Sequence, residues 1–340
     1  MYSSIADLNF FLTSSAPTRR SLLSSFNSCA TNFIISSSVI LIPQLNNKST
    51  ILFISSLSIT IVYFDNCFFC SLFEFDIENE ESFNEIKAYL VNKVKISKVH
   101  NIEEYDLTYY GTKNLNPDFV ARFNEQVAKI NIPKKTKIPQ FDVRRERVTE
   151  WMAQYLLEQE YGCKFYDEAD KRVNLKTVEI DKHTDGIDVP GIWIDNDRIR
   201  FVVCEVKASE ANQIPCDSVQ SLQQDIQKAI NDVDNRVSHE ILEYMHGIRN
   251  VKMQDDILEK IVNFLAKLIA GEKEDLADNI MFFPFLLRNN EKIVPEMNID
   301  DYKNFSLQGI KRENVENIIL SFRKKFSEFS NEVYEEAIGE

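Results

Sequence analysis

The sequence predicts a mixed α/β domain of the α+β kind, in which helices flank a small sheet. Three observations favour this class. The apolar spacing over 145–161 is typical of a helix, apolar runs at 186–194 and 199–206 are separated by a short polar turn, and helical spacing returns from 217 onward. This order of elements is typical of a small sheet covered by helices.

Length and charge narrow the class further. The chain has 340 residues, of which 44% are hydrophobic, so it can bury at least one sizeable core and is compatible with one or two domains. Its formal net charge of −14 argues against binding nucleic acid through overall attraction, so a polyanion has to be met by a local cluster of cations. Six irregularly placed cysteines favour reduced thiols and a cytoplasmic location.

Residues 1–75 are rich in serine and low in charge, and three interpretations compete for them. A membrane anchor over 49–64 is uncharged, but it is shorter than the roughly 20 apolar residues of a spanning helix and contains serines. A secretory signal peptide fits poorly, because Arg19 and Arg20 are not followed directly by a compact apolar stretch and a cleavage site. We favour a misassigned start, in which this segment is not part of the functional protein, and we expect no membrane partner.

Residues 76–143 are expected to form a helical region followed by a basic connector. Apolar spacing predicts one helix around 83–91 and another around 119–130. Pro133 and Pro139 bracket the connector. A set of nearby cations could contact DNA phosphates, with a solvated charged face as the equally weighted alternative: Lys134, Lys135, Arg144, Arg145 and Arg147.

The predicted core begins with the helix over 145–161, which Gly162 follows after the last turn. Alternating apolar residues predict a strand over 173–180 before the hairpin. Further helices are expected over three ranges: 217–229, 237–245 and 255–269. A late strand is expected over 280–287, where Pro284 predicts an edge position or a bulge, and an amphipathic helix over 313–337.

The strand over 198–207 carries an acid and a base at its end. Side chains alternate along a strand, so Glu205 and Lys207 share a face with the apolar Phe201 and Val203. Burial of charged groups costs free energy unless they are paired or bind something. This pattern therefore marks Glu205 and Lys207 as candidates for a functional site.

The hairpin indicates which residue faces this pair. If the turn centres near Asn196, equal arms bring Asp188 opposite Cys204 or Glu205, and a bulge at Pro190-Gly191 could supply the shift of one residue. Two carboxylates beside a lysine suit Mg²⁺ or Mn²⁺, which prefer oxygen ligands and are commonly held by one or two carboxylates with substrate phosphate oxygens.

These residues resemble a known family. Gly186-Ile187-Asp188, followed by an apolar strand ending Cys204-Glu205-Val206-Lys207, is similar to the PD-(D/E)XK pattern of restriction-endonuclease-like nucleases. The resemblance implies a restriction-endonuclease-like fold, metal ligands at Asp188, Glu205 and Val206, and a catalytic role for Lys207. Asp188 follows Ile187 where the family pattern has proline, and Asp185 remains the alternative ligand.

The same family often carries another acid on the helix before the sheet. Glu150 lies where that acid is expected and is the fourth candidate catalytic residue, with Glu146 one turn earlier as the competing choice. Some branches also carry a glutamine on the helix after the lysine. Gln220, Gln223 and Gln224 are in that position, although polar residues on a helix face are usually just solvated.

Within the superfamily, the segment over 144–247 is similar to the HamA family, the nuclease component of Hachiman antiphage systems. This implies a nuclease core over 144–290, with 291–340 as a C-terminal helical tail. It also implies Mg²⁺-dependent or Mn²⁺-dependent hydrolysis of DNA phosphodiester bonds, restrained until a helicase partner similar to HamB encounters foreign or damaged DNA. The alternative from another class is a catalytically silent protein-interaction module, in which the helices after 222 bind a partner.

Overall fold

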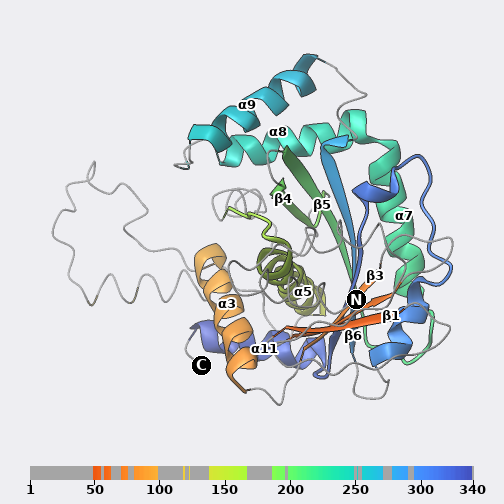
Figure 1. The fold of residues 1–340 in the computed structure, drawn as a ribbon. Helices are drawn as coiled ribbons and strands as arrows, with labels where there is room; N and C mark the ends of the chain where they lie inside the picture. The colour runs from red at the N-terminus through yellow and green to blue at the C-terminus, as the bar shows by residue number, and fades with distance from the viewer. Residues whose placement is uncertain are drawn as a thin grey trace, which may run out of the picture.

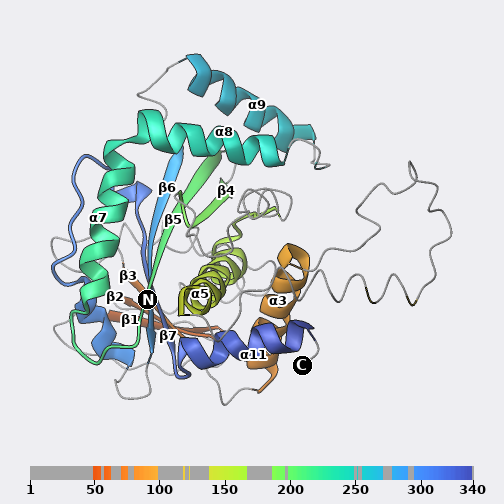
Figure 2. The same ribbon diagram turned by 180° about the vertical axis from the view of Figure 1, so that it is seen from behind.

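A computed structural model describes residues 49–54, 57–62, 70–75, 80–98, 118, 122, 138–166, 186–195, 198–248, 251, 255–270, 278–289 and 295–338. The fold is a seven-stranded mixed sheet with helices on both faces, so the predicted mixed α/β class is confirmed. Figure 1 shows the strands between a group of helices formed by α3, α5 and α11 and a second group that includes α7 and α8. Figure 2 shows the same two groups from behind.

The strands lie in the order β1-β2-β3-β7-β6-β5-β4 across the sheet. The pairs β1–β2, β2–β3 and β4–β5 are antiparallel, whereas β3–β7, β7–β6 and β6–β5 are parallel. Their bounds are β1 Ser49–Ile54, β2 Leu57–Val62, β3 Cys70–Phe75, β4 Val189–Asp195, β5 Arg198–Ser209, β6 Ile280–Asn289 and β7 Asn317–Phe322.

The helices that cover the first face are α3 Glu80–Lys98, α5 Ile138–Tyr161 and α11 Phe326–Ile338. The other face is covered by α7 Asp217–Asn231, the π-helix η3 Val233–Val237, α8 Ser238–Gly247, α9 Asp255–Ala270 and the 3-10 helix η4 Pro295–Tyr302; a short 3-10 helix, η5 Arg312–Asn314, precedes β7. None of the helices in the described ranges combines the length and apolarity that crossing a bilayer requires.

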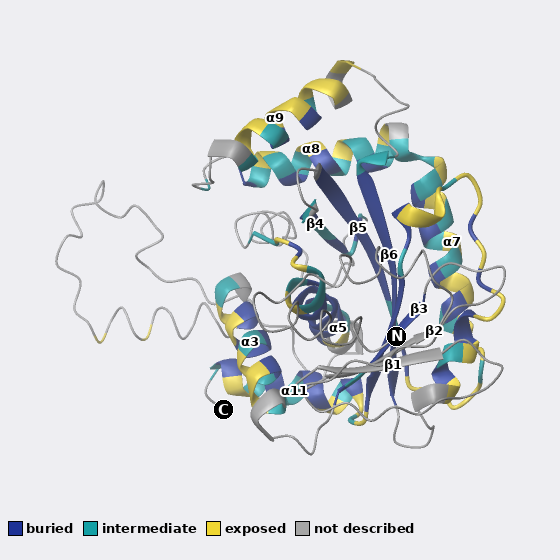
Figure 3. Ribbon diagram, viewed as in Figure 1, coloured by how far each residue is buried: buried dark blue, intermediate teal, exposed yellow. Residues whose placement is uncertain are grey.

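Each face of the sheet has its own apolar core, and β5 shows why. Val202, Cys204 and Val206 pack with α5 and α11, whereas Phe201 and Val203 pack with α7 and α8. Figure 3 shows β5 and β6 as almost continuously buried ribbons between the two layers. This alternation follows from the two-residue period of a strand, and it directs Glu205 and Lys207 to the α7 face, as the sequence predicts.

Several predicted elements are confirmed. The helix predicted over 145–161 is α5, which begins earlier, at Ile138, with Pro139 in its first turn, where the missing N–H has no intrahelical partner to lose. The hairpin is β4–β5, and the helices predicted after it are α7, α8 and α9. The helix predicted around 83–91 is α3.

The hairpin register is continuous. Val189 pairs with Cys204 and Asp195 with Arg198, so two residues lie between the strands and the predicted bulge at Pro190 is absent. The following residue, Gly191, has a different reason to be small. A Cβ atom there would lie 2.4 Å from the Phe165 ring, so only glycine lets this neighbouring segment approach β4.

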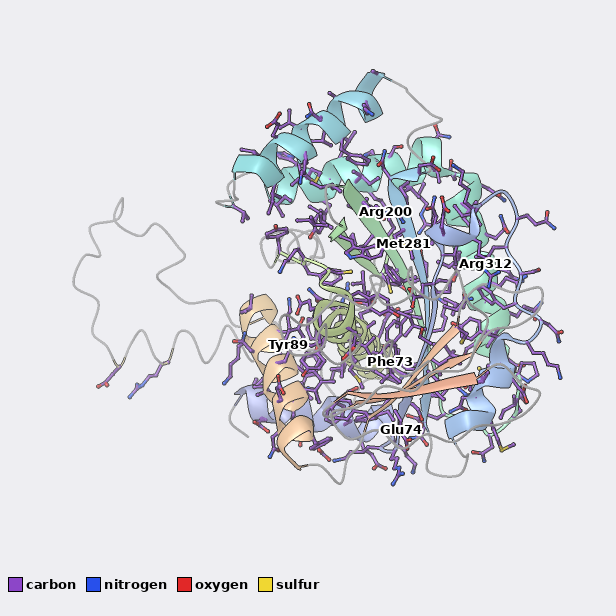
Figure 4. All side chains as sticks on the ribbon, viewed as in Figure 1. Phe73, Glu74, Tyr89, Arg200, Met281 and Arg312 are labelled. Atoms are coloured by element: carbon purple, nitrogen blue, oxygen red, sulfur yellow. The ribbon has the colours of Figure 1, made fainter. Side chains whose placement is uncertain are left out.

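An arginine packs near the start of β5. Arg200 lies over the Trp193 ring at 5.8 Å, and its Nη1 donates to the carbonyl of Glu313 at 3.3 Å. Figure 4 shows Arg200 and Met281 on neighbouring strands. Arg200 therefore packs at one end of the strand, while Glu205 and Lys207 emerge toward the other.

Two predictions about the late strands are wrong. β6 lies inside the sheet, not at its edge, because its ladder with β7 begins after Pro284, at Phe285, and the Pro284 carbonyl accepts a hydrogen bond from Tyr302 at 3.1 Å. The helix predicted over 313–337 is also wrong at its start. Strand β7 occupies Asn317–Phe322, and the α-helix of this range, α11, begins only at Phe326, so the expected C-terminal helical tail contains a central strand.

The low-charge segment 1–75 contributes strands to the sheet. β3 ends at Phe75 and lies between β2 and β7, so part of the segment predicted to be a misassigned start belongs to the sheet. The strand predicted over 173–180 lies outside the described residues. So do residues 1–48 and, apart from residue 122, the helix predicted around 119–130.

Candidate active site at the end of the β4–β5 hairpin

Asp188 and Glu205 are brought together by the register of the hairpin. Because Val189 pairs with Cys204, the next position outward sets Asp188 opposite Glu205. The Asp188 carboxylate is held there by the backbone, since its Oδ2 accepts a hydrogen bond from the Val206 N–H at 2.7 Å. The sequence predicted this meeting of two carboxylates, and the structure confirms it.

Lys207 belongs to the same cluster. It lies two residues beyond Glu205 on the same face of β5, and its Nζ is 3.0 Å from the Asp225 carboxylate on α7. Burial acts to lower the pKa of Lys207, but the hydrogen bond that Lys207 donates to Asp225 and the charges of Asp188 and Glu205 outweigh it and raise that pKa. Lys207 is therefore held as a cation beside the two carboxylates.

Glu205 is buried with one oxygen lacking a hydrogen bond. The residue is 3% exposed, and its Oε1 has no hydrogen-bond partner in the described part of the chain. The nearest cation to that oxygen is Arg236 of η3, whose Nη2 lies 3.7 Å away. A buried carboxylate oxygen without a donor is costly, and a ligand that bound this oxygen would offset that cost.

The acids of α5 approach the cluster from the other face. Glu150 is buried and forms an ion pair with Arg147 at 2.7 Å, whereas Glu146 is half-buried. The charge of Glu146 raises the pKa values of both Asp188 and Glu150, and the charge of Asp188 raises the pKa of Glu150. Glu146 and Glu150, the two helix acids that the sequence analysis singles out, therefore lie close enough to Asp188 for their charges to interact. Glu150 is already paired with Arg147.

Burial raises the pKa values of Glu205, Asp188 and Glu150. It raises the pKa of Glu205 to about 9, with the charge of Asp188 as the second cause, and the cations Arg236 and Lys207 oppose it. It raises the pKa of Asp188 against the hydrogen bond from Val206, and that of Glu150 to about 8 against Arg147. Near neutral pH, Glu205 therefore holds a proton that a bound cation would displace.

The donor atoms fit a hard divalent cation. Carboxylate oxygens come from Asp188 and Glu205, and the Val206 carbonyl turns to the same side of β5 as its N–H, which faces Asp188. Within the described ranges, no group of three or more His, Cys, Asp or Glu side chains is arranged to hold a metal. Two carboxylates and a carbonyl nevertheless suit Mg²⁺, which keeps several waters and takes substrate oxygens.

The predicted DNA-contacting cations separate in the structure. Arg144 is 5% exposed, lies over the Tyr334 ring at 5.0 Å and donates to Asn331, so it is not presented to a phosphate, which corrects that prediction. Arg147 is paired with Glu150, and Arg145 is exposed. Lys134 and Lys135, and likewise the alternative ligand Asp185, lie outside the described residues.

Sequence reasoning missed the residues that other elements bring to the cluster. Asp225 of α7 binds Lys207, and Arg236 of η3 approaches Glu205. The predicted glutamines serve differently: Gln223 Oε1 accepts from the Ser306 N–H at 3.4 Å, a contact with the segment after η4. Helical periodicity places Asp225 on α7 but gives no sign that this turn would dock against the end of β5.

Two carboxylates, a paired lysine and a nearby arginine define a buried cluster of ionisable groups at the end of the hairpin. Comparison of the chain with known protein families, with curated proteins and with solved structures found no match.

Proposed function

We propose that this protein is a metal-dependent nuclease that hydrolyses DNA phosphodiester bonds at the β4–β5 end of the sheet. The observation that carries the proposal is the meeting of Asp188 and Glu205 beside Lys207, with a buried Glu205 oxygen that has no hydrogen bond. The three side chains are those that resemble the PD-(D/E)XK pattern. Asp188, Glu205 and the Val206 carbonyl would hold Mg²⁺ or Mn²⁺.

The bound cation would lower the pKa of a coordinated water and neutralise charge that builds up on the phosphate. The protein's own groups supply the rest. The Val206 N–H orients the Asp188 carboxylate, and Asp225 orients the Lys207 ammonium group toward the same end of β5. A lysine held as a cation there stabilises negative charge on an attacking oxygen or on the phosphate.

We also propose the biological setting that the resemblance to HamA implies: the nuclease effector of a cytoplasmic antiphage system, restrained until a HamB-like helicase partner meets foreign or damaged DNA. The net charge of −14 supports this, because an acidic enzyme is not drawn onto DNA by long-range attraction. Weak DNA binding by the chain alone at physiological salt is the expected behaviour. The exposed Arg145 is the remaining described candidate for a phosphate contact from the predicted basic set.

A catalytically silent interaction module is the second candidate. The observation in its favour is that α8 and α9 expose large apolar side chains: Leu242, Leu258 and Val262. Such residues are common at surfaces that bind other proteins. This candidate predicts that helicase binding survives Glu205→Gln and that no DNA is cut by any form of the protein.

The proposal is tested with the purified chain on linear, nicked and supercoiled DNA, with Mg²⁺, Mn²⁺ or EDTA, and with and without a co-encoded helicase. We expect cation-dependent cleavage, lost by at least about a hundredfold in Asp188→Asn, Glu205→Gln and Lys207→Met. Glu328→Gln, which changes an exposed glutamate on α11, is the matched control and should cut like the wild type. Equal cleavage by Glu205→Gln and the wild type would rule out this site.

A further inference from the structure

Arg236 is anchored beside the active-site carboxylates by two separate contacts. Its Nε lies 3.1 Å from Glu240 Oε1 on α8, and its Nη2 donates to the Gly186 carbonyl at 2.9 Å. Glu240 also accepts a hydrogen bond through Oε2 from the Ile187 N–H at 2.5 Å. Arg236 and Glu240 together therefore tie η3 and α8 to the backbone immediately before Asp188.

These contacts use one edge of the guanidinium group and leave the other. A guanidinium presents five N–H donors in a planar fork. The Nε and Nη2 atoms that form one side of the fork are bound to Glu240 and Gly186, whereas Nη1 has no hydrogen bond in the described part of the chain. The Arg236 side chain is 33% exposed, so a molecule from solution can reach it.

One nitrogen of the guanidinium group lies close to the cluster. Arg236 Nη2, which belongs to both edges of the fork, lies 3.7 Å from Glu205 Oε1, the carboxylate oxygen without a hydrogen bond. A distance of 3.7 Å is too long for a hydrogen bond, so the guanidinium does not satisfy that oxygen. A π-helix carries the residue, and such segments are frequent at functional sites.

We propose that Arg236 is a substrate-binding residue whose Nη1–Nη2 edge holds a non-bridging oxygen of the DNA phosphate at the Asp188–Glu205 site, with Glu240 as its positioning residue. This inference rests on the proposed nuclease function. Arginine suits the role because a fixed, bidentate fork matches the geometry of phosphate oxygens. A phosphate brought to Glu205 has the nearest available guanidinium donors at the place where its negative charge needs them.

The same arginine could instead act only as an internal counter-ion for Glu205. The two roles predict opposite changes in the cleavage rate. Loss of a phosphate-binding residue weakens DNA binding and slows cleavage, whereas loss of an inhibitory counter-ion speeds cleavage. The anchoring favours the first role. Glu240 and Gly186 bind the guanidinium at 3.1 and 2.9 Å, whereas Glu205 lies 3.7 Å away, so Glu205 is not the main partner of Arg236.

The test measures the affinity for a fluorescently labelled DNA duplex by anisotropy, in Ca²⁺ buffer to prevent cleavage, and the cleavage rate in Mg²⁺. Arg236→Gln should weaken DNA binding by about tenfold or more and reduce the cleavage rate. Arg236→Lys should recover only part of the affinity, because a lysine cannot make the bidentate contact. Arg323→Gln, at an exposed arginine elsewhere on the surface, should bind and cut DNA as the wild type does.

Glu240→Gln provides a second variant that leaves the arginine in place, and it should weaken DNA binding less than Arg236→Gln does. Thermal unfolding of each variant verifies the fold. Wild-type affinity and cleavage in Arg236→Gln, or faster cleavage, would overturn this inference and leave the nuclease proposal intact. Absence of any cation-dependent cleavage by the wild type, with or without the helicase, would overturn both.

Discussion

The structure contains two clusters of buried charged residues, one around Arg288 and Asp301 and one around Asp188 and Glu205. They differ in whether each buried charge lies beside an opposite charge. Arg288 and Asp301 are both fully buried, and their Nε and Oδ2 atoms are 2.9 Å apart. Arg288 also donates to Ser209 and to the Gln213 carbonyl, and Asp301 accepts from the Cys216 N–H at 2.7 Å. At the Asp188–Glu205 cluster, by contrast, two acids face each other, and the cation nearest to Glu205 Oε1, Arg236, lies 3.7 Å away.

The difference separates a structural role from a functional one. A buried cation and anion with several hydrogen bonds tie η4 and the segment after β5 to β6, and removal of one partner leaves an unpaired charge. Two neighbouring carboxylates oppose each other's ionisation and so lower the stability of the metal-free fold at neutral pH. Burial of like charges is retained where a ligand compensates it, which is why we assign function to the second cluster only.

The largest expected effect is on the free energy of unfolding and comes from the Arg288–Asp301 cluster, which we call the matched cluster because each buried charge has a partner of opposite sign. Arg288→Met should lower the free energy of unfolding by on the order of 3–5 kcal/mol, because Asp301 would remain buried without its cation. Urea denaturation followed by circular dichroism measures it. Arg323→Met, which removes an exposed ion pair with Glu74, should change stability by less than about 1 kcal/mol. Equal effects from the two variants would contradict the structural role of Arg288.

At the Asp188–Glu205 cluster, the unmatched cluster, removal of a charge should raise the free energy of unfolding. Burial and the charge of Asp188 raise the pKa of Glu205 to about 9, so the folded protein binds this proton more tightly than the unfolded chain does. The resulting contribution to the free energy of unfolding is complete below the ordinary glutamate pKa and is lost as the pH rises toward 9. Glutamine mimics the protonated acid without titrating. Glu205→Gln should therefore raise the free energy of unfolding in EDTA by about 1–3 kcal/mol at pH 8 and by much less at pH 5.

Urea denaturation at both pH values checks this result. Glu328→Gln, at an exposed carboxylate, should show no such dependence on pH. Destabilisation by Glu205→Gln at pH 8 would mean that the carboxylate is already matched, and the contrast between the two clusters would disappear.

The smallest expected effect concerns the support of Lys207. Asp225→Asn should slow cleavage by about tenfold, the rate equivalent of about 1.4 kcal/mol, because the ammonium group loses the partner that orients it. Since Asp225 raises the pKa of Lys207, the variant should also lose activity at a lower pH on the alkaline side. The dependence of kcat on pH measures both. Asp217→Asn, an exposed acid in the first turn of α7, is the control, and equal pH profiles for the two variants would contradict the assignment.

Local patterns predicted much of the fold and the centre of the site. The alternation along 199–207 was sufficient to place Glu205 and Lys207 on one face, and the short turn predicted their approach to Asp188, because strand period and hairpin register act over a few residues. The same local reasoning failed for β7, whose helix-like apolar spacing was overridden by pairing with strands from both ends of the chain.

The sequence by itself determined which acids and which lysine would gather at the end of β5. Only the tertiary structure decided that Asp225 holds Lys207, that Arg236 is anchored beside Glu205, and that Arg144 is buried over Tyr334. The physical reason is the range of the interactions. Strand alternation and a tight turn are properties of consecutive residues, whereas these last contacts depend on how separate helices dock onto the sheet.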